Sequence, residues 1–269
     1  MADVERRRQA YQRVAERSFS EAASEGSLTR VRGELYRLAG LFQREPLLRK
    51  TFADIAVPDE AKRALLEELF RDRVDPVTLS LVESLVGVEG VTWRLPVVLE
   101  DVAVQATLAE ADQEDRLGAV EDELFRFARL LEATPELRGA LTNPALPDEN
   151  KRALLNDLLA GRAADETAVL VRHVVTKHGD PVARIDKLAD RAAMLRDRVV
   201  ALARTAVALD DGRRDRLAQA LSRATGRNVD LEVVVDPEIL GGVVARVGDE
   251  IIDGTVRRRL ELALERLAG

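Results

Sequence analysis

The hydrophobic positions in the first two thirds of the chain follow the spacing of amphipathic helices. Leu35, Leu38, Ala39 and Phe42 recur at intervals of three and four residues, so they share one face of a helix. Pro46 suits the first turn of the next helix, because proline already has the backbone angle of a helix start and needs no hydrogen-bond donor there. The same kind of pattern predicts further helices at residues 3–25, 76–88, 95–111 and 165–177.

This helical pattern occurs twice, at a separation of 89 residues. The stretch Glu34-Leu-Tyr-Arg-Leu-Ala recurs as Glu123-Leu-Phe-Arg-Phe-Ala. Compared without a gap, residues 34–69 and 123–158 are identical at 18 of 36 positions. Such agreement at a fixed separation indicates a duplicated structural unit. We infer two copies of one helical unit, at residues 28–110 and 117–199.

Beyond residue 196 the pattern changes to that of a small α/β domain. Asp210 or Asp211 is expected to start a helix that Gly226 ends, since glycine readily takes the left-handed conformation after a helix. Residues 199–207 fit either a first strand or the tail of the preceding helix. Alternating and β-branched residues predict strands at 228–235, 243–247 and 250–252. A final helix has its predicted apolar positions at Val256, Leu260, Leu264 and Leu267.

These patterns predict a mainly α fold with a small α/β C-terminal domain. The predicted architecture is two tandem helical bundles followed by a βαββα-type domain. The expected domains are residues 1–112, 113–196 and 197–269. Segment 95–111 is expected to serve both bundles, ending the first and starting the second.

Composition narrows the possible functions. Aromatic residues make up 3% of the chain and cysteine is absent, which excludes disulfides, thiolate metal sites and a cysteine nucleophile. The net charge of −7 argues against nucleic acid as the main partner. The N-terminus lacks an apolar signal region, and apolar residues never run long enough to span a membrane. We therefore expect a soluble cytoplasmic protein.

None of the candidate reactive groups forms a convincing site. His173 and His178 are five residues apart, which does not match the spacing of a helical metal pair, so we interpret both as ordinary helix residues. Asp249, Glu250 and Asp253 resemble Mg²⁺ ligands, but a turn explains Asp249 and a helix cap explains Asp253. No catalytic, cofactor-binding or metal-binding residue is therefore predicted.

Two further features have structural interpretations. The run from Arg257 to Arg259 points in different directions on a helix, which favours a solvated or protein-facing surface over a phosphate grip. Trp93 is the sole tryptophan and is expected to pack in the core.

The C-terminal stretch carries a specific resemblance. Gly248-Asp249 fits a type II′ hairpin turn between two short strands. The whole stretch resembles the C-terminal signature of the delta subunit of F-type ATP synthases, the family of the oligomycin-sensitivity-conferring protein. The resembling residues are Gly241, Gly242, Arg246, Gly248, Asp249, Asp253, Gly254, Arg257 and Leu260. The duplicated helical region is similar to the longer actinobacterial form of that subunit.

The resemblance implies a non-catalytic stator subunit without a cofactor. Such a subunit links the alpha subunits of the catalytic head to the membrane-anchored b subunit during proton-driven ATP synthesis. It also implies a peripheral position at the cytoplasmic face of the cell membrane. The family's alpha-binding groove is expected between segments 95–111 and 165–177, lined by Leu99, Val102, Ala106, Leu170 and Val174. An alternative function is that of a helical-repeat protein-binding adaptor unrelated to the synthase, because tandem bundles alone would also suit such a protein.

Overall fold

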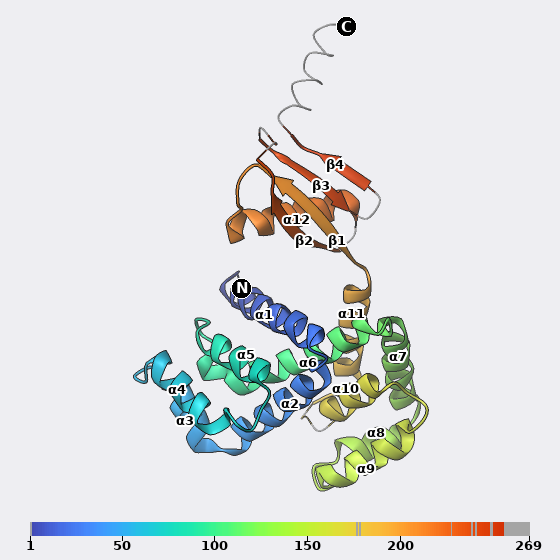
Figure 1. Cartoon of the computed structure of the whole chain (residues 1–269). Helices are drawn as coiled ribbons and strands as arrows, with labels where there is room; N and C mark the ends of the chain where they lie inside the picture. The colour runs from blue at the N-terminus through green and yellow to red at the C-terminus, as the bar shows by residue number, and fades with distance from the viewer. Residues whose placement is uncertain are drawn as a thin grey trace, which may run out of the picture. The chain divides into compact units, whose positions relative to one another are not determined.

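The structure is a computed structural model that describes residues 2–255 except 176, 178, 227, 238, 240, 248 and 249. The chain divides into two compact units, Met1–Ala192 and Ala193–Gly269. The first unit is helical, and the second contains a sheet (Figure 1). The predicted class, mainly α with a small α/β domain at the C-terminal end, is confirmed. The division of the helical unit into separate bundles stays a prediction.

The helices of the first unit follow the predicted segments closely. Pro46 and Pro135 each stand at the first position of a helix, as the sequence predicts. The helices are α1 (Ala2–Ser24), α2 (Leu28–Arg44), α3 (Pro46–Ala53), α4 (Asp59–Phe70), α5 (Pro76–Val86), α6 (Leu95–Gln113), α7 (Leu117–Ala133), α8 (Pro135–Thr142), α9 (Asp148–Leu159), α10 (Asp165–Val175) and α11 (Pro181–Arg196). A short 3-10 turn, η1 (Thr92–Arg94), precedes α6.

Four consecutive helices occur twice with the same lengths. Helices α2 to α5 and helices α7 to α10 have start and end residues that differ by 89 throughout. Buried positions repeat as well, for example Leu35 with Leu124 and Leu66 with Leu155. We call α2–α5 the first copy and α7–α10 the second copy.

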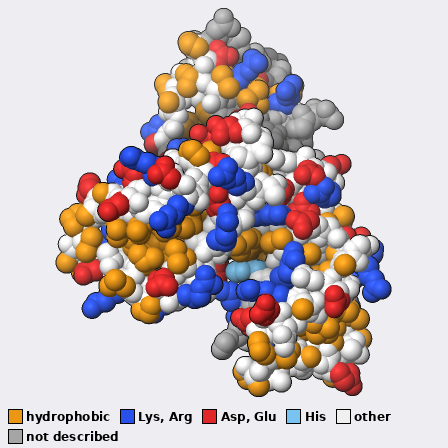
Figure 2. Space-filling model, turned by 60° about the horizontal axis from the view of Figure 1, so that its bottom comes forward, with side chains coloured by type: hydrophobic (Ala, Val, Ile, Leu, Met, Phe, Trp, Pro, Cys, Tyr) orange, Lys and Arg blue, Asp and Glu red, His pale blue; other side chains and the backbone are white. Residues whose placement is uncertain are grey.

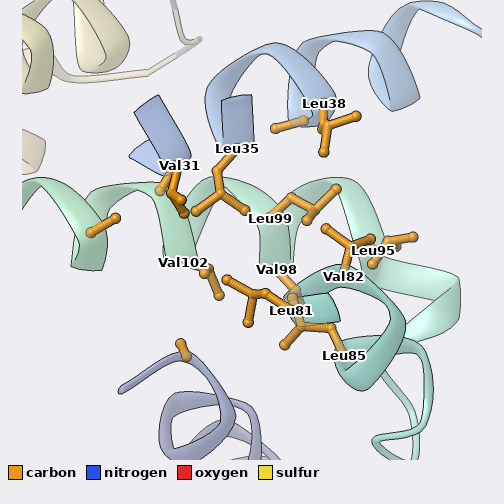
Figure 3. Close-up of a cluster of buried hydrophobic side chains, with 14 of the residues drawn as sticks. Val31, Leu35, Leu38, Leu81, Val82, Leu85, Leu95, Val98, Leu99 and Val102 are labelled. Atoms are coloured by element: carbon orange, nitrogen blue, oxygen red, sulfur yellow. The ribbon is translucent and has the colours of Figure 1, made fainter. Parts of the chain in front are cut away.

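The first copy packs around a core of aliphatic side chains. Leu35 and Leu38 of α2 point toward Leu99 of α6, and Leu81 and Leu85 of α5 lie beside Val98 of α6 (Figure 3). Leu35, Leu81, Leu85 and Leu99 are fully buried. Burial of one such leucine side chain stabilises the fold by about 1.5–3 kcal/mol, so this cluster is a major source of stability.

Helix α6 is the element that both copies share. It packs against α1, α2 and α3 on the side of the first copy and against α7 and α10 of the second. Its buried residues cover most of the helix surface: Leu95, Pro96, Val98, Leu99, Val102, Ala103, Val104, Ala106, Thr107, Leu108, Glu110 and Ala111. The polar residues Glu100, Asp101 and Gln105 are confined to a narrow, partly buried stripe, because protein encloses most of the helix.

The second unit contains a four-stranded sheet with a helix on one face. Its strands are β1 (Arg198–Thr205), β2 (Asn228–Val235), β3 (Val243–Val247) and β4 (Glu250–Asp253), and its helix is α12 (Asp211–Thr225). The spatial order is β2-β1-β3-β4, with β1 parallel to β2 and the other pairs antiparallel. From sequence, the stretch 199–207 fitted either a strand or the tail of the preceding helix; most of it forms strand β1.

Alternation along β1 explains how the sheet is covered. Ala201 and Ala203 are fully buried and join the cluster formed with Leu221 of α12, whereas Arg204 points away and is exposed. The helix begins as predicted, with Asp210 accepting a hydrogen bond from the backbone N–H of Arg213. It also ends as predicted, because Gly226 has a left-handed φ of 68°. The predicted final helix lies outside the described residues.

Candidate interaction surfaces

Each copy holds its last helix with a glutamate carboxylate, which is buried in the first copy and partly buried in the second. In the first copy, Glu34 Oε2 accepts hydrogen bonds from Asp75 N at 2.8 Å and Thr78 Oγ1 at 2.7 Å. In the second copy, Glu123 Oε2 accepts them from Ala164 N at 2.9 Å and Thr167 Oγ1 at 2.6 Å. The repeated glutamate noted in the sequence therefore fixes the start of α5 and of α10, a structural role.

Ion pairs join the two copies. Arg32 of α2 is buried and contacts Glu110 of α6 at 2.7 Å and Asp165 of α10 at 3.0 Å. A second pair joins α11 to α6, where Arg191 donates to Asp101 at 2.8 Å. Since a buried charge is tolerated only with a partner, the contacts of Arg32 hold α2 against α6 and α10.

Near this junction lies one carboxylate cluster with metal-like spacing. Among the described residues, Glu110, Glu114 and Glu166 offer oxygen atoms within 4.8 Å of one another. Two guanidinium groups already occupy the cluster: Arg32 pairs with Glu110, and Arg116 pairs with both other carboxylates. We interpret the cluster as an ion-pair network, because cations already neutralise it.

A cleft of about 530 Å³ opens between the two copies. Its floor holds His173 of α10, whose ring lies 4.9 Å from the ring of Tyr36 of α2. In Figure 2, Lys and Arg side chains gather around the histidine. We call this hollow the basic cleft; the cationic side chains that line it are Arg37, Arg44, Arg152, Arg172 and Lys177.

Burial controls the protonation of His173. The pKa of His173 is lowered from 6.5 to about 4, mainly by desolvation; Glu100 opposes the shift, and Lys177 and Arg184 contribute to it. The side chain is therefore neutral near pH 7. The interpretation of His173 as an ordinary helix residue did not foresee this position, because the partners come from distant segments. His178 lies outside the described residues.

The shift in the pKa of His173 predicts a pH dependence of stability. Between pH 6.5 and 4 the unfolded chain binds this proton before the folded chain does, so folding stability is complete above about pH 6.5 and falls as pH decreases. From pH 7 to pH 5 we expect His173 to contribute a loss of about 2 kcal/mol. Urea unfolding at both pH values should show a smaller loss in His173→Phe. An equal loss in the variant would contradict the assignment.

The five residues predicted to line the alpha-binding groove come together, but they are buried. Leu99, Val102 and Ala106 are fully buried in α6, and Leu170 and Val174 lie in the adjacent α10 with at most 6% exposure. Helix α2 covers α6 here and reaches α10 through the ring contact of Tyr36. These side chains do not line an open groove in this conformation, and binding of alpha at this place stays a prediction.

The signature glycines lie where backbone segments approach closely. Gly241 and Gly242 have φ of 153° and 89°. A Cβ atom on Gly242 would lie 2.5 Å from the carbonyl oxygen of Gly254, whose own N–H donates to Val243 O at 2.9 Å. Asp253 Oδ1 accepts from Thr255 N at 2.9 Å, which is a local turn contact. Four other signature residues lie outside the described residues: Gly248, Asp249, Arg257 and Leu260. Arg246, the last signature residue, is described.

Arg246 belongs to the face of the sheet opposite α12. It stands between Leu202 of β1 and Ile251 of β4, while Arg204 of β1 lies opposite Val244 of β3. These five side chains line a hollow of about 280 Å³. Ile251 is 67% exposed. We call this surface the open sheet face; it alternates apolar and cationic groups across neighbouring strands.

The expectation that Trp93 packs in the core is wrong. Its side chain is 57% exposed, with the guanidinium of Arg94 5.3 Å from the ring centroid. Trp93 lies in η1, and the next residue but one, Leu95, is fully buried at the start of α6. Leu95 therefore occupies the core position at this junction, and the indole of Trp93 lies at the surface.

The described residues form tandem helical copies and a small α/β unit, and they contain no assembled catalytic or metal site. No helix in the described part of the chain is both long and apolar enough to cross a membrane. A family profile described as ATP synthase delta (OSCP) subunit matches residues 12–92 and 104–267. The chain belongs to this family.

Relatives of similar length carry the same assignment. ATP synthase subunit delta of Frankia alni is 43% identical over 241 residues, which cover 87% of this chain and 86% of that protein. The subunit of Thermobifida fusca is 38% identical, covering 88% and 89%. That of Nocardia farcinica is 37% identical, covering 98% and 96%. The chain is thus a structural subunit of the synthase stalk and not a catalytic one, and the unrelated adaptor is excluded.

Proposed function

We propose that this chain links the alpha subunits of the catalytic head to the membrane-anchored b subunit while proton flow drives ATP synthesis. In this role it holds the head against the torque of the rotor from the cytoplasmic face of the cell membrane. Family membership supports a place in the stalk, and the open sheet face is the observation that favours a specific contact.

The open sheet face suits an amphipathic helix at the end of the b subunit. Leu202, Val244 and Ile251 offer apolar contacts, and Arg204 and Arg246 alternate with them across the strands and add positive charge. A helix with an apolar stripe bordered by carboxylates would match both features. Helix α12 covers the opposite face through the cluster around Leu221, so the proposed contact falls on the face that no described helix covers.

Substitution of Ile251 tests this contact. Ile251→Asp places an acidic charge on the edge-strand side of this face but removes little core packing, since the side chain is 67% exposed. We expect binding to co-expressed b subunit to weaken at least about tenfold. Val207→Asp is the matched control, because Val207 is 60% exposed and does not line the hollow. Unchanged b binding by Ile251→Asp would contradict the proposal.

The helical unit is the proposed partner of the alpha subunits. The buried groove residues Leu99, Val102, Ala106, Leu170 and Val174 can receive an alpha helix only if α2 moves off α6. Arg32 holds α2 to α6 and α10, so Arg32→Ala should make this movement easier and strengthen binding. Calorimetric titration of the full chain with the alpha N-terminal peptide tests the proposal. Weaker binding by Arg32→Ala would place the alpha contact elsewhere.

A further inference from the structure

The basic cleft has the opposite charge to the chain as a whole. Five cationic side chains line it against two carboxylates, Glu100 and Asp148, whereas the chain has a net charge of −7. Arg172 donates to Asn156 at 2.9 Å, and Arg37 lies 3.7 Å from Glu34, so both guanidinium groups are held at the rim. Concave walls concentrate the field of such charges, which favours an anionic ligand.

Comparison of the two copies shows where this charge arises. The duplication allows each cleft residue to be compared with its equivalent 89 residues away. Three of the five cations are replaced by a neutral or acidic residue at the equivalent position of the other copy. The pairs are Arg44 with Ala133, Arg172 with Glu83, and Lys177 with Val88. The positive charge is therefore a feature of this junction and not of the repeated helical unit.

Small residues at the same place open the cleft. Gly40 and Ala39 of α2 line it, whereas the equivalent of Gly40 in the second copy is Arg129. A helix-interior glycine costs about 0.5–1 kcal/mol relative to alanine, so the open space is obtained at the expense of helix stability. The apolar rings and side chains at the floor, Tyr36 and Val169, suit the aliphatic part of a ligand.

We propose that the basic cleft binds an acidic segment of a partner protein, with carboxylates held by Arg44, Arg152 and Arg172. Guanidinium groups bind carboxylates in bidentate fashion. A compact phosphate fits less well, because phosphate sites commonly use backbone N–H groups at helix N-termini. Here α2 and α10 contribute their C-terminal halves, and the first turn of α9 carries its own Asp148 and Glu149. The inference concerns this surface alone and is independent of the stator contacts proposed above.

The test uses the full chain and a fluorescently labelled oligoglutamate peptide, with oligoglutamine as the neutral probe. We expect saturable binding of oligoglutamate that weakens with added salt, because exposed charges are screened. Arg44→Ala/Arg172→Ala should weaken it at least about tenfold, since each removes a charge-assisted contact. The matched control is Arg71→Ala/Arg126→Ala, which removes two exposed cations that do not line the cleft.

Three results would overturn the proposal. The first is that both double variants weaken oligoglutamate binding equally, which would mean general charge attraction and no specific site. The second is displacement of the peptide by inorganic triphosphate at far lower concentration, which means a phosphate site. The third is binding to anionic lipid vesicles with no binding of oligoglutamate. Circular dichroism of each variant verifies that the helices are intact.

Discussion

Glu34→Ala should destabilise the helical unit by about 3–5 kcal/mol. The carboxylate is 2% exposed, and its removal leaves the backbone N–H of Asp75 and the hydroxyl of Thr78 without their acceptor. Asp75 also caps α5 by accepting from Val77 N at 3.0 Å, so the loss reaches the start of that helix. Urea unfolding followed by helical circular dichroism measures the effect.

Two companion variants separate the hydrogen bonds from packing. Glu34→Gln retains the shape and an acceptor oxygen, so it should cost less than half as much. Glu123→Ala, the equivalent change in the second copy, should also reduce the free energy of unfolding by less than Glu34→Ala does, because Glu123 is only partly buried. In a double-mutant cycle, Glu34→Ala with Thr78→Val should be less than additive. Additive costs would show that the two groups do not stabilise each other.

Gly242→Ala should unfold the second unit or destabilise it by about 3–5 kcal/mol. The residue has a φ of 89°, which a side chain disfavours. The added Cβ would also meet two backbone atoms, Gly254 O at 2.5 Å and Thr255 Cα at 2.8 Å. Backbone atoms cannot turn aside as a flexible side chain can, so β3 and the segment after β4 would have to separate.

Gly226→Ala is the matched control. Gly226 also has a left-handed φ, 68°, but no atom lies within 4 Å of the position of its Cβ. It should therefore cost only the backbone strain, about 1–2 kcal/mol. Hydrogen exchange measured by mass spectrometry should show lost protection in β1–β4 of Gly242→Ala and retained protection in α1–α11. Equal effects of the two substitutions would mean that the close approach to Gly254 is unimportant.

Local chemistry made the helices and their duplication predictable. Prolines at helix starts, such as Pro46, act within a few residues, and the duplication shows as identical residues such as Glu34 and Glu123 at a fixed separation. Both signals can be read from the sequence alone, whereas the hydrogen bonds of the two glutamates to the following helices could not. The strand at residues 199–207 was less certain, because a short apolar run fits both a strand and a helix until its neighbours are known.

The surfaces between the copies could not be predicted, because they join residues far apart in the sequence. Arg32 meets Asp165 across 133 positions, and no local pattern marks either residue as paired. The groove positions Leu99 and Leu170 lie on helices that contact each other, but the sequence did not indicate that α2 packs over α6 at this place. His173 gave no signal for the same reason, since Tyr36 and Glu100 create its environment.

The sharing of α6 by both copies has a mechanical consequence. Two repeated units joined only by a loop can swing about that loop, whereas one continuous helix, α6, packs against both copies here. To rotate one copy against the other, the backbone hydrogen bonds of α6 would have to bend and its packing on both sides would have to slip. The junction therefore has a high bending stiffness, and force applied to one copy is transmitted to the other with little compliance.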